Sequence, residues 1–334
     1  MDTPSRMLWI DNMKTIGIYF IVLGHFFSVH TAFIYVFNVP LFFIISGFLC
    51  KHESNNLELW KKLWWNLIVP MIIICITNSL ISTILEIHSG CIDMNRIINF
   101  IPSMIMGMHR SVGVCWFIYT LILIKIIYQF TKGFPIQILL FVILLSIAYV
   151  LHETEIGTIS LFQKPNSIIN VCTAFPFFLI GAYLRYAKEY LNSVKSKYML
   201  FTMFAIGMFY LYLSGHFNGG DVWMFMCKYG KDIFWFLVGG MAGTLAVYSI
   251  SKMLNYKSRC IELISEGTII ILGFHVHFIG IIRRHISAEP SMMDFIYAAI
   301  IVILFIPIIY IIETYFPLMI GKYRATKLHI KSIE

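Results

Sequence analysis

The stretch FIYAAIIVILFIPIIYIIETYF, at residues 295–316, contains a single charged residue, Glu313. A helix of about 20 mainly apolar residues is long enough to cross the hydrocarbon core of a bilayer. Because lipid offers the backbone no hydrogen-bond partners, such segments are expected to be helices. Nine further apolar segments, each bounded by polar residues, lie at 10–29, 32–49, 63–85, 113–130, 135–151, 168–187, 198–214, 233–250 and 267–282. The sequence therefore predicts an all-α polytopic membrane protein with about ten transmembrane helices.

The composition of the whole chain agrees with a membrane protein. Of its 334 residues, 59% are apolar and 13% are charged, which is about half the charged fraction of an ordinary soluble domain. No connecting segment is long enough for a soluble domain, so residues 1–334 are expected to form a single membrane-embedded domain. The segment 95–107 is too short and too polar to cross, and we expect it to lie along the interface or to re-enter the membrane.

The distribution of Lys and Arg predicts the orientation of the chain. With ten crossings and an N-terminus inside the cell, 17 basic residues fall on the inner side and 7 on the outer side. Cytoplasmic loops carry the excess of basic residues in membrane proteins. Both termini are therefore expected in the cytoplasm, and the protein in the cell (inner or plasma) membrane, in contact with its lipids. No basic and aromatic cluster lies outside the apolar segments, so a nucleic-acid partner is not expected.

Metal binding is not expected either. The seven cysteines show no metal-ligand spacing, and three of them, Cys75, Cys115 and Cys172, lie inside apolar segments, where packing is their commonest role. His275 and His277 are two residues apart, so on a helix they point about 200° away from each other and cannot chelate one ion. At most one of them is expected to face the interior of the bundle.

A few ionisable residues lie inside the apolar segments, where each costs about 2.5–3.5 kcal/mol on insertion scales. Lys14 and His25 are eleven residues apart, which places them on one helix face and about 16 Å apart along the axis. With Asp11 they form a polar stripe suited to a long anionic ligand. In the alternative interpretation, Lys14 extends to the headgroups and His25 makes an interhelical hydrogen bond. Lys125 is expected to extend to the membrane surface.

Five strings, spaced in order along the chain, carry a recognisable pattern. In WIDNMKTIGIYFIVLGH (9–25), a basic residue, ten spacers and a histidine follow one another at Lys14 and His25. The other strings are FNVPLFFIISGFL (37–49), WFIYTLIL (116–123), FPFFLIGAYL (175–184) and EGTIIILGFH (266–275). Together they resemble the acyltransferase-3 family of membrane O-acyltransferases, with a second family histidine at His275. The chain resembles the short form, without the C-terminal extracytoplasmic domain of some members.

Two positions depart from the family pattern. The family usually has Arg where Lys14 stands. Lys keeps the positive charge but does not bind an anion through two parallel hydrogen bonds as Arg does. Some members also have an Arg-x-x-Arg pair at the start of the third helix, where this chain has Lys61 and Lys62.

The resemblance implies transfer of an acyl group, most often acetyl, from acetyl-CoA to a hydroxyl of a cell-surface polysaccharide or its sugar precursor. Acetyl-CoA is then a donor substrate, and no tightly bound cofactor is expected. His25 and His275 are the implied catalytic residues, and His25 acts either as a general base or as the carrier of a transient acetyl group. The residues expected to bind the donor are Lys14, Arg6, Lys61 and Lys62. Those expected to bind the sugar are Asp11, Asn38, Ser46 and Trp116.

A transporter or flippase of a glycan precursor is the alternative function. Such a protein is expected to carry charged residues at mid-membrane in several helices, or discontinuous helices in corresponding halves of the chain. The sequence shows neither feature.

Overall fold

The computed structural model describes residues 6–27, 31–90, 92–153, 166–220, 222–254, 256–287 and 289–322. Both chain termini, which are predicted to be cytoplasmic, lie outside these residues. The helices are α1 (Leu8–Gly24), α2 (Thr31–Leu49), α3 (Asn56–Leu63), α4 (Val69–Ser89), α5 (Met94–Ile98), α6 (Phe100–Ile105), α7 (His109–Val112), α8 (Trp116–Phe130), α9 (Phe134–Glu153), α10 (Asn166–Ile169), α11 (Val171–Leu184), α12 (Lys188–Ser193), α13 (Lys197–Asn218), α14 (Ile233–Leu254), α15 (Arg259–Glu266), α16 (Thr268–His285) and α17 (Asp294–Tyr315).

The remaining regular elements are short. A π-helical turn, η1 (Trp64–Ile68), joins α3 to α4, and the 3₁₀ turns are η2 (Gly113–Cys115), η3 (Arg185–Ala187), η4 (Met224–Met226) and η5 (Pro317–Ile320). The strands β1 (Val222–Trp223) and β2 (Lys228–Tyr229) form an antiparallel hairpin in which Val222 pairs with Tyr229. The chain is thus essentially all-α, as the apolar segments predict.

Each of the ten predicted segments contains a helix. Within the described residues, seven helices are long and apolar enough to cross a membrane, and the count is eight if α15 and α16, bent by 83° at their junction, make one crossing. Helix α1 has 17 residues, and the described apolar part of α2 covers Phe33–Leu49. Neither is among the seven helices counted above. The chain is therefore a polytopic membrane protein, whereas ten crossings stay a prediction.

The segment 95–107 forms two short helices instead of a crossing. Helix α5 has 5 residues and α6 has 6, so each extends less than about 10 Å. Arg96 on α5 holds this segment against α4, because its Nη2 lies 2.9 Å from Oε2 of Glu86.

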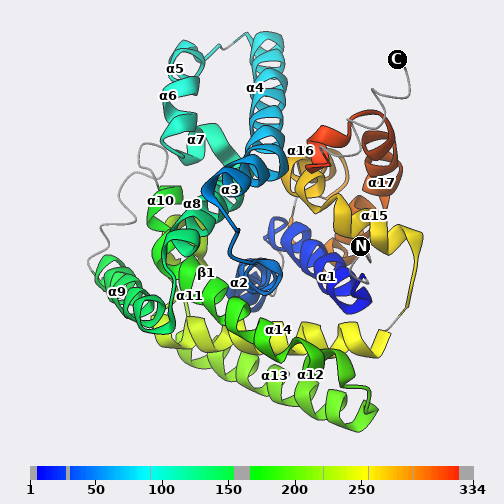
Figure 1. The fold of residues 1–334 in the computed structure, drawn as a ribbon. Helices are drawn as coiled ribbons and strands as arrows, with labels where there is room; N and C mark the ends of the chain where they lie inside the picture. Colours follow the sequence, from blue (N-terminus) through cyan, green and yellow to red (C-terminus); the bar gives the residue numbers. More distant parts are fainter. Residues whose placement is uncertain are drawn as a thin grey trace, which may run out of the picture.

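Helices α1 and α2 lie in the middle of the bundle, with α4 to α7 on one side and the α13–α14 pair on another (Figure 1). Helix α2 crosses α11 at very short range. A Cβ atom at Gly47 would lie 1.9 Å from the carbonyl oxygen of Phe178, and one at Gly181 would lie 2.0 Å from that of Ile44. Only glycine allows this approach, so Gly47 and Gly181 set the close spacing of α2 and α11.

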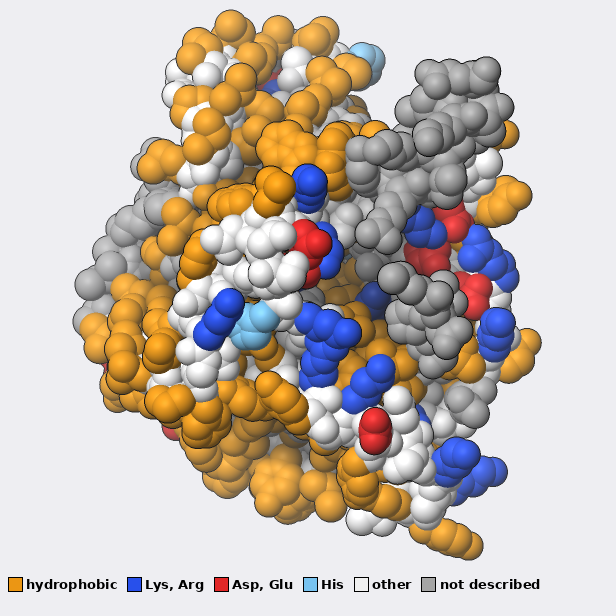
Figure 2. Space-filling view, in the orientation of Figure 1, with side chains coloured by type: hydrophobic (Ala, Val, Ile, Leu, Met, Phe, Trp, Pro, Cys, Tyr) orange, Lys and Arg blue, Asp and Glu red, His pale blue; other side chains and the backbone are white. Residues whose placement is uncertain are grey.

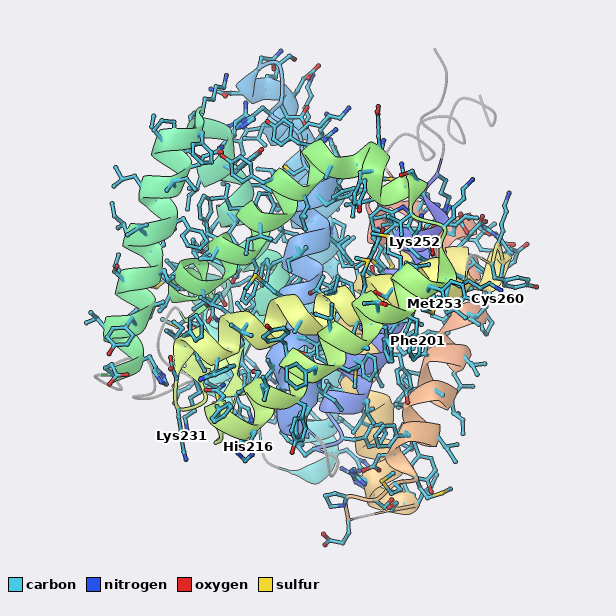
Figure 3. The ribbon with its side chains drawn as sticks, turned by 90° about the horizontal axis from the view of Figure 1, so that it is seen from below. Phe201, His216, Lys231, Lys252, Met253 and Cys260 are labelled. Carbon is cyan, nitrogen blue, oxygen red and sulfur yellow. The ribbon has the colours of Figure 1, made fainter. Side chains whose placement is uncertain are left out.

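Helices α13 and α14 pack as an antiparallel pair along one flank. Figure 3 shows His216 and Lys231 at one end of this pair and Phe201, Lys252 and Met253 toward the other end. The Lys252 ammonium donates to the carbonyl oxygen of Asn192 at 2.9 Å, which fixes the end of α14 to α12.

Ion pairs connect the start of α1 to the ends of α15 and α17. Arg6 pairs with Glu266 at 2.5 Å, and Lys322 lies 2.6 Å from Glu266 and 2.7 Å from Glu313. Hydrogen bonding to Asp11, together with the pairing to Glu266, raises the pKa of Arg6 above its ordinary value. We call the surface around Arg6, Glu266, Glu313 and Lys322 the charged face. Figure 2 shows Lys, Arg, Asp and Glu side chains gathered around a hollow, with apolar side chains on the flanks.

Candidate active site

Two histidines from distant parts of the sequence face each other. His25 is the C-terminal cap of α1, and His275 lies near the middle of α16. Their ring centroids are 4.6 Å apart and their planes are inclined by 80°. The two implied catalytic residues are therefore brought together, at the end of α1 that lies away from the charged face.

Hydrogen bonds to the backbone orient both rings. Nδ1 of His25 lies 2.9 Å from the carbonyl oxygen of Ile21, and Nδ1 of His275 lies 2.8 Å from that of Ile271. A carbonyl oxygen only accepts, so each Nδ1 carries the proton, and Nε2 of each neutral ring keeps a lone pair. Each ring therefore presents a basic nitrogen.

His275 is a buried residue with an unsatisfied polar atom. Its side chain is completely buried, and its Nε2 has no hydrogen-bond partner among the described residues. Buried polar atoms almost always have a partner, and exceptions call for an explanation such as a role in chemistry or in ligand binding. His25 is only partly buried, so a ligand can reach the pair from its side.

His277 points away from this pair, as the helical period predicts. Its Nε2 lies 2.7 Å from Oδ1 of Asn78 on α4, and the amide nitrogen of Asn78 donates to the carbonyl oxygen of Gly273 at 3.1 Å. His277 thus connects α16 to α4 and takes no part in the histidine pair.

Arg283 fixes the end of α1, a role that the sequence did not reveal. Its Nη2 donates to the carbonyl oxygen of Phe26 at 2.5 Å and lies 2.9 Å from Oδ2 of Asp294. The guanidinium carbon also lies 4.9 Å from the centroid of the Phe26 ring. A cation at a helix C-terminus stabilises the unpaired carbonyl groups there, so Arg283 holds the backbone next to His25.

A cavity of about 370 Å³ lies beside the charged face and reaches to within one helical turn of the histidine pair, although neither histidine lines it. Lys14, Glu266 and Lys322 line its outer part, whereas Ile21 and Leu272 line its inner part. Ile21 lies one helical turn before His25, and Leu272 lies three residues before His275. Lys14 of α1 and Ser46 of α2 thus line the same cavity.

Lys125 is a second cation in this cavity. We expected it to extend to the membrane surface, but α8 turns it into the cavity wall. Neither Lys14 nor Lys125 makes a hydrogen bond or ion pair with a described residue. Two ammonium groups without an ion-pair partner among the described residues favour an anionic ligand in such a cleft.

Among the other predicted donor-binding residues, none lines this cavity. Arg6 is bound to Asp11 and Glu266, and Lys61 is exposed on α3. Lys62 pairs with Glu53 and faces an adjoining cavity.

Three of the four predicted sugar-binding residues also lie outside the cavity lining. Asp11 is buried with both carboxylate oxygens engaged, by Nε of Arg6 at 2.6 Å and by the hydroxyl of Ser265 at 2.6 Å. Asn38 is buried, and its Oδ1 accepts from the backbone N–H of Val39 at 2.8 Å. Trp116 is buried at the start of α8. Only Ser46 is thus placed where it can touch a ligand in this cavity, and the binding roles stay predictions.

Comparison with known families agrees with the fold and with the quoted strings. An all-α polytopic membrane protein with two facing histidines is the class that the structure defines. The family model described as an acyltransferase domain matches residues 7–314. The chain belongs to the acyltransferase-3 family and is a multi-pass membrane acyltransferase. No curated protein and no solved structure gave a significant match.

Proposed function

We propose that this protein transfers an acetyl group from acetyl-CoA to a hydroxyl of a cell-surface polysaccharide or its sugar precursor. One observation carries the proposal: a single cavity extends from the unpaired cations Lys14 and Lys125 toward the His25–His275 pair. Along α1, Lys14 and His25 are separated by about 16 Å, a span that an extended pantetheine arm can cover. No tightly bound cofactor is part of this proposal.

The charged face is the proposed entry side for the donor. CoA is anionic and cytosolic, and the cavity entrance carries Lys14, Lys125 and Lys322. This assignment places the start of α1 in the cytoplasm of a cell-membrane protein, as the distribution of Lys and Arg predicts. The acceptor sugar then reaches His25 from the opposite end of α1.

The geometry of His25 suits general-base catalysis. Its Nδ1 is held by the carbonyl oxygen of Ile21, so Nε2 is the atom that takes the proton from the acceptor hydroxyl. The hydroxyl oxygen then attacks the thioester carbonyl, the new C–O bond forms, the C–S bond breaks, and the CoA thiolate leaves. In a two-step variant, Nε2 attacks the thioester carbonyl and the CoA thiolate leaves; the acceptor hydroxyl then attacks acetyl-His25 and gives its proton to Nε2 of His275 as the N–C bond breaks. His275 helps by keeping a second basic nitrogen beside the reacting groups.

The decisive experiment uses the full-length protein, purified and placed in lipid nanodiscs. Acetyl-CoA consumption and the mass of each candidate sugar are followed together, and surface glycans from cells with and without the chain are compared by mass spectrometry. We expect acceptor-dependent release of CoA, and a glycan acetyl ester that disappears with the chain. Unchanged glycan acetylation in its absence, with no acetyl ester formed in nanodiscs, would contradict the proposal.

A further inference from the structure

A second cavity, also about 370 Å³, adjoins the first on the side of α3 and α8. The two cavities share four wall residues: Leu49, Asn66, Leu67 and Lys125. Asn66 and Leu67 belong to the π-helical turn η1, a distortion that often occurs at functional sites. One elongated ligand can therefore occupy both cavities.

A flat aromatic surface forms part of the second cavity. The ring of His52 stacks on that of Tyr128, with centroids 4.2 Å apart and planes inclined by 16°. Tyr128 is buried, whereas His52 is exposed, so the second face of the imidazole is accessible. Stacking on a flat ring is a general way in which proteins bind a nucleobase without distinguishing one base from another.

The segment that carries His52 is held in place before any ligand binds. Oε1 of Gln129 accepts from the backbone N–H of Glu53 at 2.9 Å, and its Nε2 donates to the carbonyl oxygen of Glu53 at 3.2 Å. Arg185 donates to the carbonyl oxygen of Cys50. A preorganised segment loses little conformational entropy when a ligand binds.

The charge of the second cavity suits phosphate groups. Lys51, Lys62 and Lys125 line it, with Glu53 as the one carboxylate among the lining residues. Lys62 is paired with Glu53, but Lys51 and Lys125 have no ion-pair partner in the described part of the chain. The cavity therefore combines a stacking surface with uncompensated positive charge.

We propose that the second cavity binds the nucleotide end of the acyl-CoA donor. The adenine base stacks on the open face of His52, the phosphate groups contact Lys51, Lys62 and Lys125, and the pantetheine arm continues into the first cavity toward His25. This inference rests on the proposed function, because it takes acyl-CoA as the donor, and it adds His52, Lys51 and the stacked Tyr128 to the residues that recognise it.

The test compares two donors that carry the same acetyl thioester, acetyl-CoA and acetyl-pantetheine, which lacks the nucleotide. We expect Lys51→Met and His52→Ala each to raise KM for acetyl-CoA by about tenfold, without changing kcat or the KM for acetyl-pantetheine. His52→Phe keeps a flat ring and should restore most of the affinity. Lys195→Met removes a charge from an exposed position that lines neither cavity, and should leave both KM values unchanged. Equal changes for the two donors, or none for either, would overturn the inference.

Binding of adenosine 3′,5′-bisphosphate separates this inference from the proposed function. The wild-type protein should bind this nucleotide, measured by isothermal titration calorimetry in nanodiscs, and His52→Ala should weaken its binding about tenfold. Binding without any thioester consumption would contradict the proposed function but support a nucleotide site in the second cavity. Thioester consumption without nucleotide binding would refute the second-cavity assignment and leave the proposed function standing.

Discussion

The imidazole rings of His25 and His275 lie 4.6 Å apart, centroid to centroid, although they belong to the first and the sixteenth helix of the chain. Each ring donates through Nδ1 to a backbone carbonyl oxygen one turn earlier in the chain, so each of the two neighbouring rings keeps a basic Nε2. No ion pair with a described residue involves either ring. The pair is thus arranged to accept a proton, which is the task of the general base in acyl transfer.

Replacing His25 by Gln tests the base directly. Gln keeps a polar side chain of similar reach but cannot take up a proton, and general-base catalysis contributes roughly 10²–10⁴-fold to a rate. We expect kcat for acetyl transfer to fall by about that factor, measured as CoA release in the presence of acceptor.

His216 provides the matched control for this substitution. It is exposed near one end of α13, as Figure 3 shows, and lines neither of the two cavities described above. His216→Gln should therefore keep wild-type activity. If His25→Gln protein inserts and elutes like wild type and still transfers acetyl at the wild-type rate, His25 is not the base.

His275→Leu should separate activity from stability. The buried Nε2 of His275 lacks a partner, and a buried unsatisfied polar atom costs about 1–3 kcal/mol. A leucine removes that cost, so we expect an unfolding temperature equal to or above that of wild type, measured by thermal-shift fluorescence. Acetyl transfer should nevertheless fall at least about tenfold, since a second basic nitrogen is lost. A markedly lower unfolding temperature would show that His275 is retained for packing instead.

The sequence predicted those features of the fold that are encoded locally. Apolar length is a property of each segment, so each of the ten predicted segments contains a helix, whereas the number of crossings stays a prediction. The end of α1 was less predictable, because no proline or charge marks it. The expected apolar segment continued to residue 29, whereas the helix ends at Gly24. His25 therefore caps the helix and does not lie within it.

For the candidate site too, the sequence predicted the local features and missed the long-range contacts. The eleven-residue spacing fixes Lys14 and His25 on one helix face, and the structure places Lys14 in the cavity. Lys125, Arg283 and His52 reach their neighbours only through contacts between segments that are far apart in the sequence. The bond from Arg283 to the Phe26 carbonyl, for example, spans 257 residues of sequence. A contact between residues so far apart cannot be predicted from the residues near either of them.

Removing the charge of Lys14 should weaken donor binding specifically. Its ammonium group lines the cavity without a partner among the described residues, so Lys14→Met should raise KM for acetyl-CoA by roughly tenfold, a loss of about 1.4 kcal/mol. Lys14→Arg should keep most of the affinity, because the charge remains. Initial rates at varied acetyl-CoA concentrations give both values.

Lys231→Met is the control for charge removal. Lys231 is exposed at the end of the α13–α14 pair near His216 (Figure 3), so KM should not change. If Lys14→Met lowers only the yield of inserted protein, with KM unaltered, Lys14 is a topology anchor and has no part in binding the donor.

The crossing of α2 and α11 should be the most sensitive contact in the bundle. A methyl group at Gly47 would lie 1.9 Å from the carbonyl oxygen of Phe178, and backbone cannot move aside as a flexible side chain can. Gly47→Ala must therefore push the helices apart, and overpacking of this kind costs typically 1–3 kcal/mol. We expect a lower unfolding temperature, measured by fluorescence-detected size exclusion after heating. Gly280→Ala on α16 adds the same methyl group where no atom lies within 4 Å, and it should stabilise the helix by about 0.5–1 kcal/mol. Equal unfolding temperatures for the two variants would mean that α2 and α11 are not held as closely as their glycines indicate.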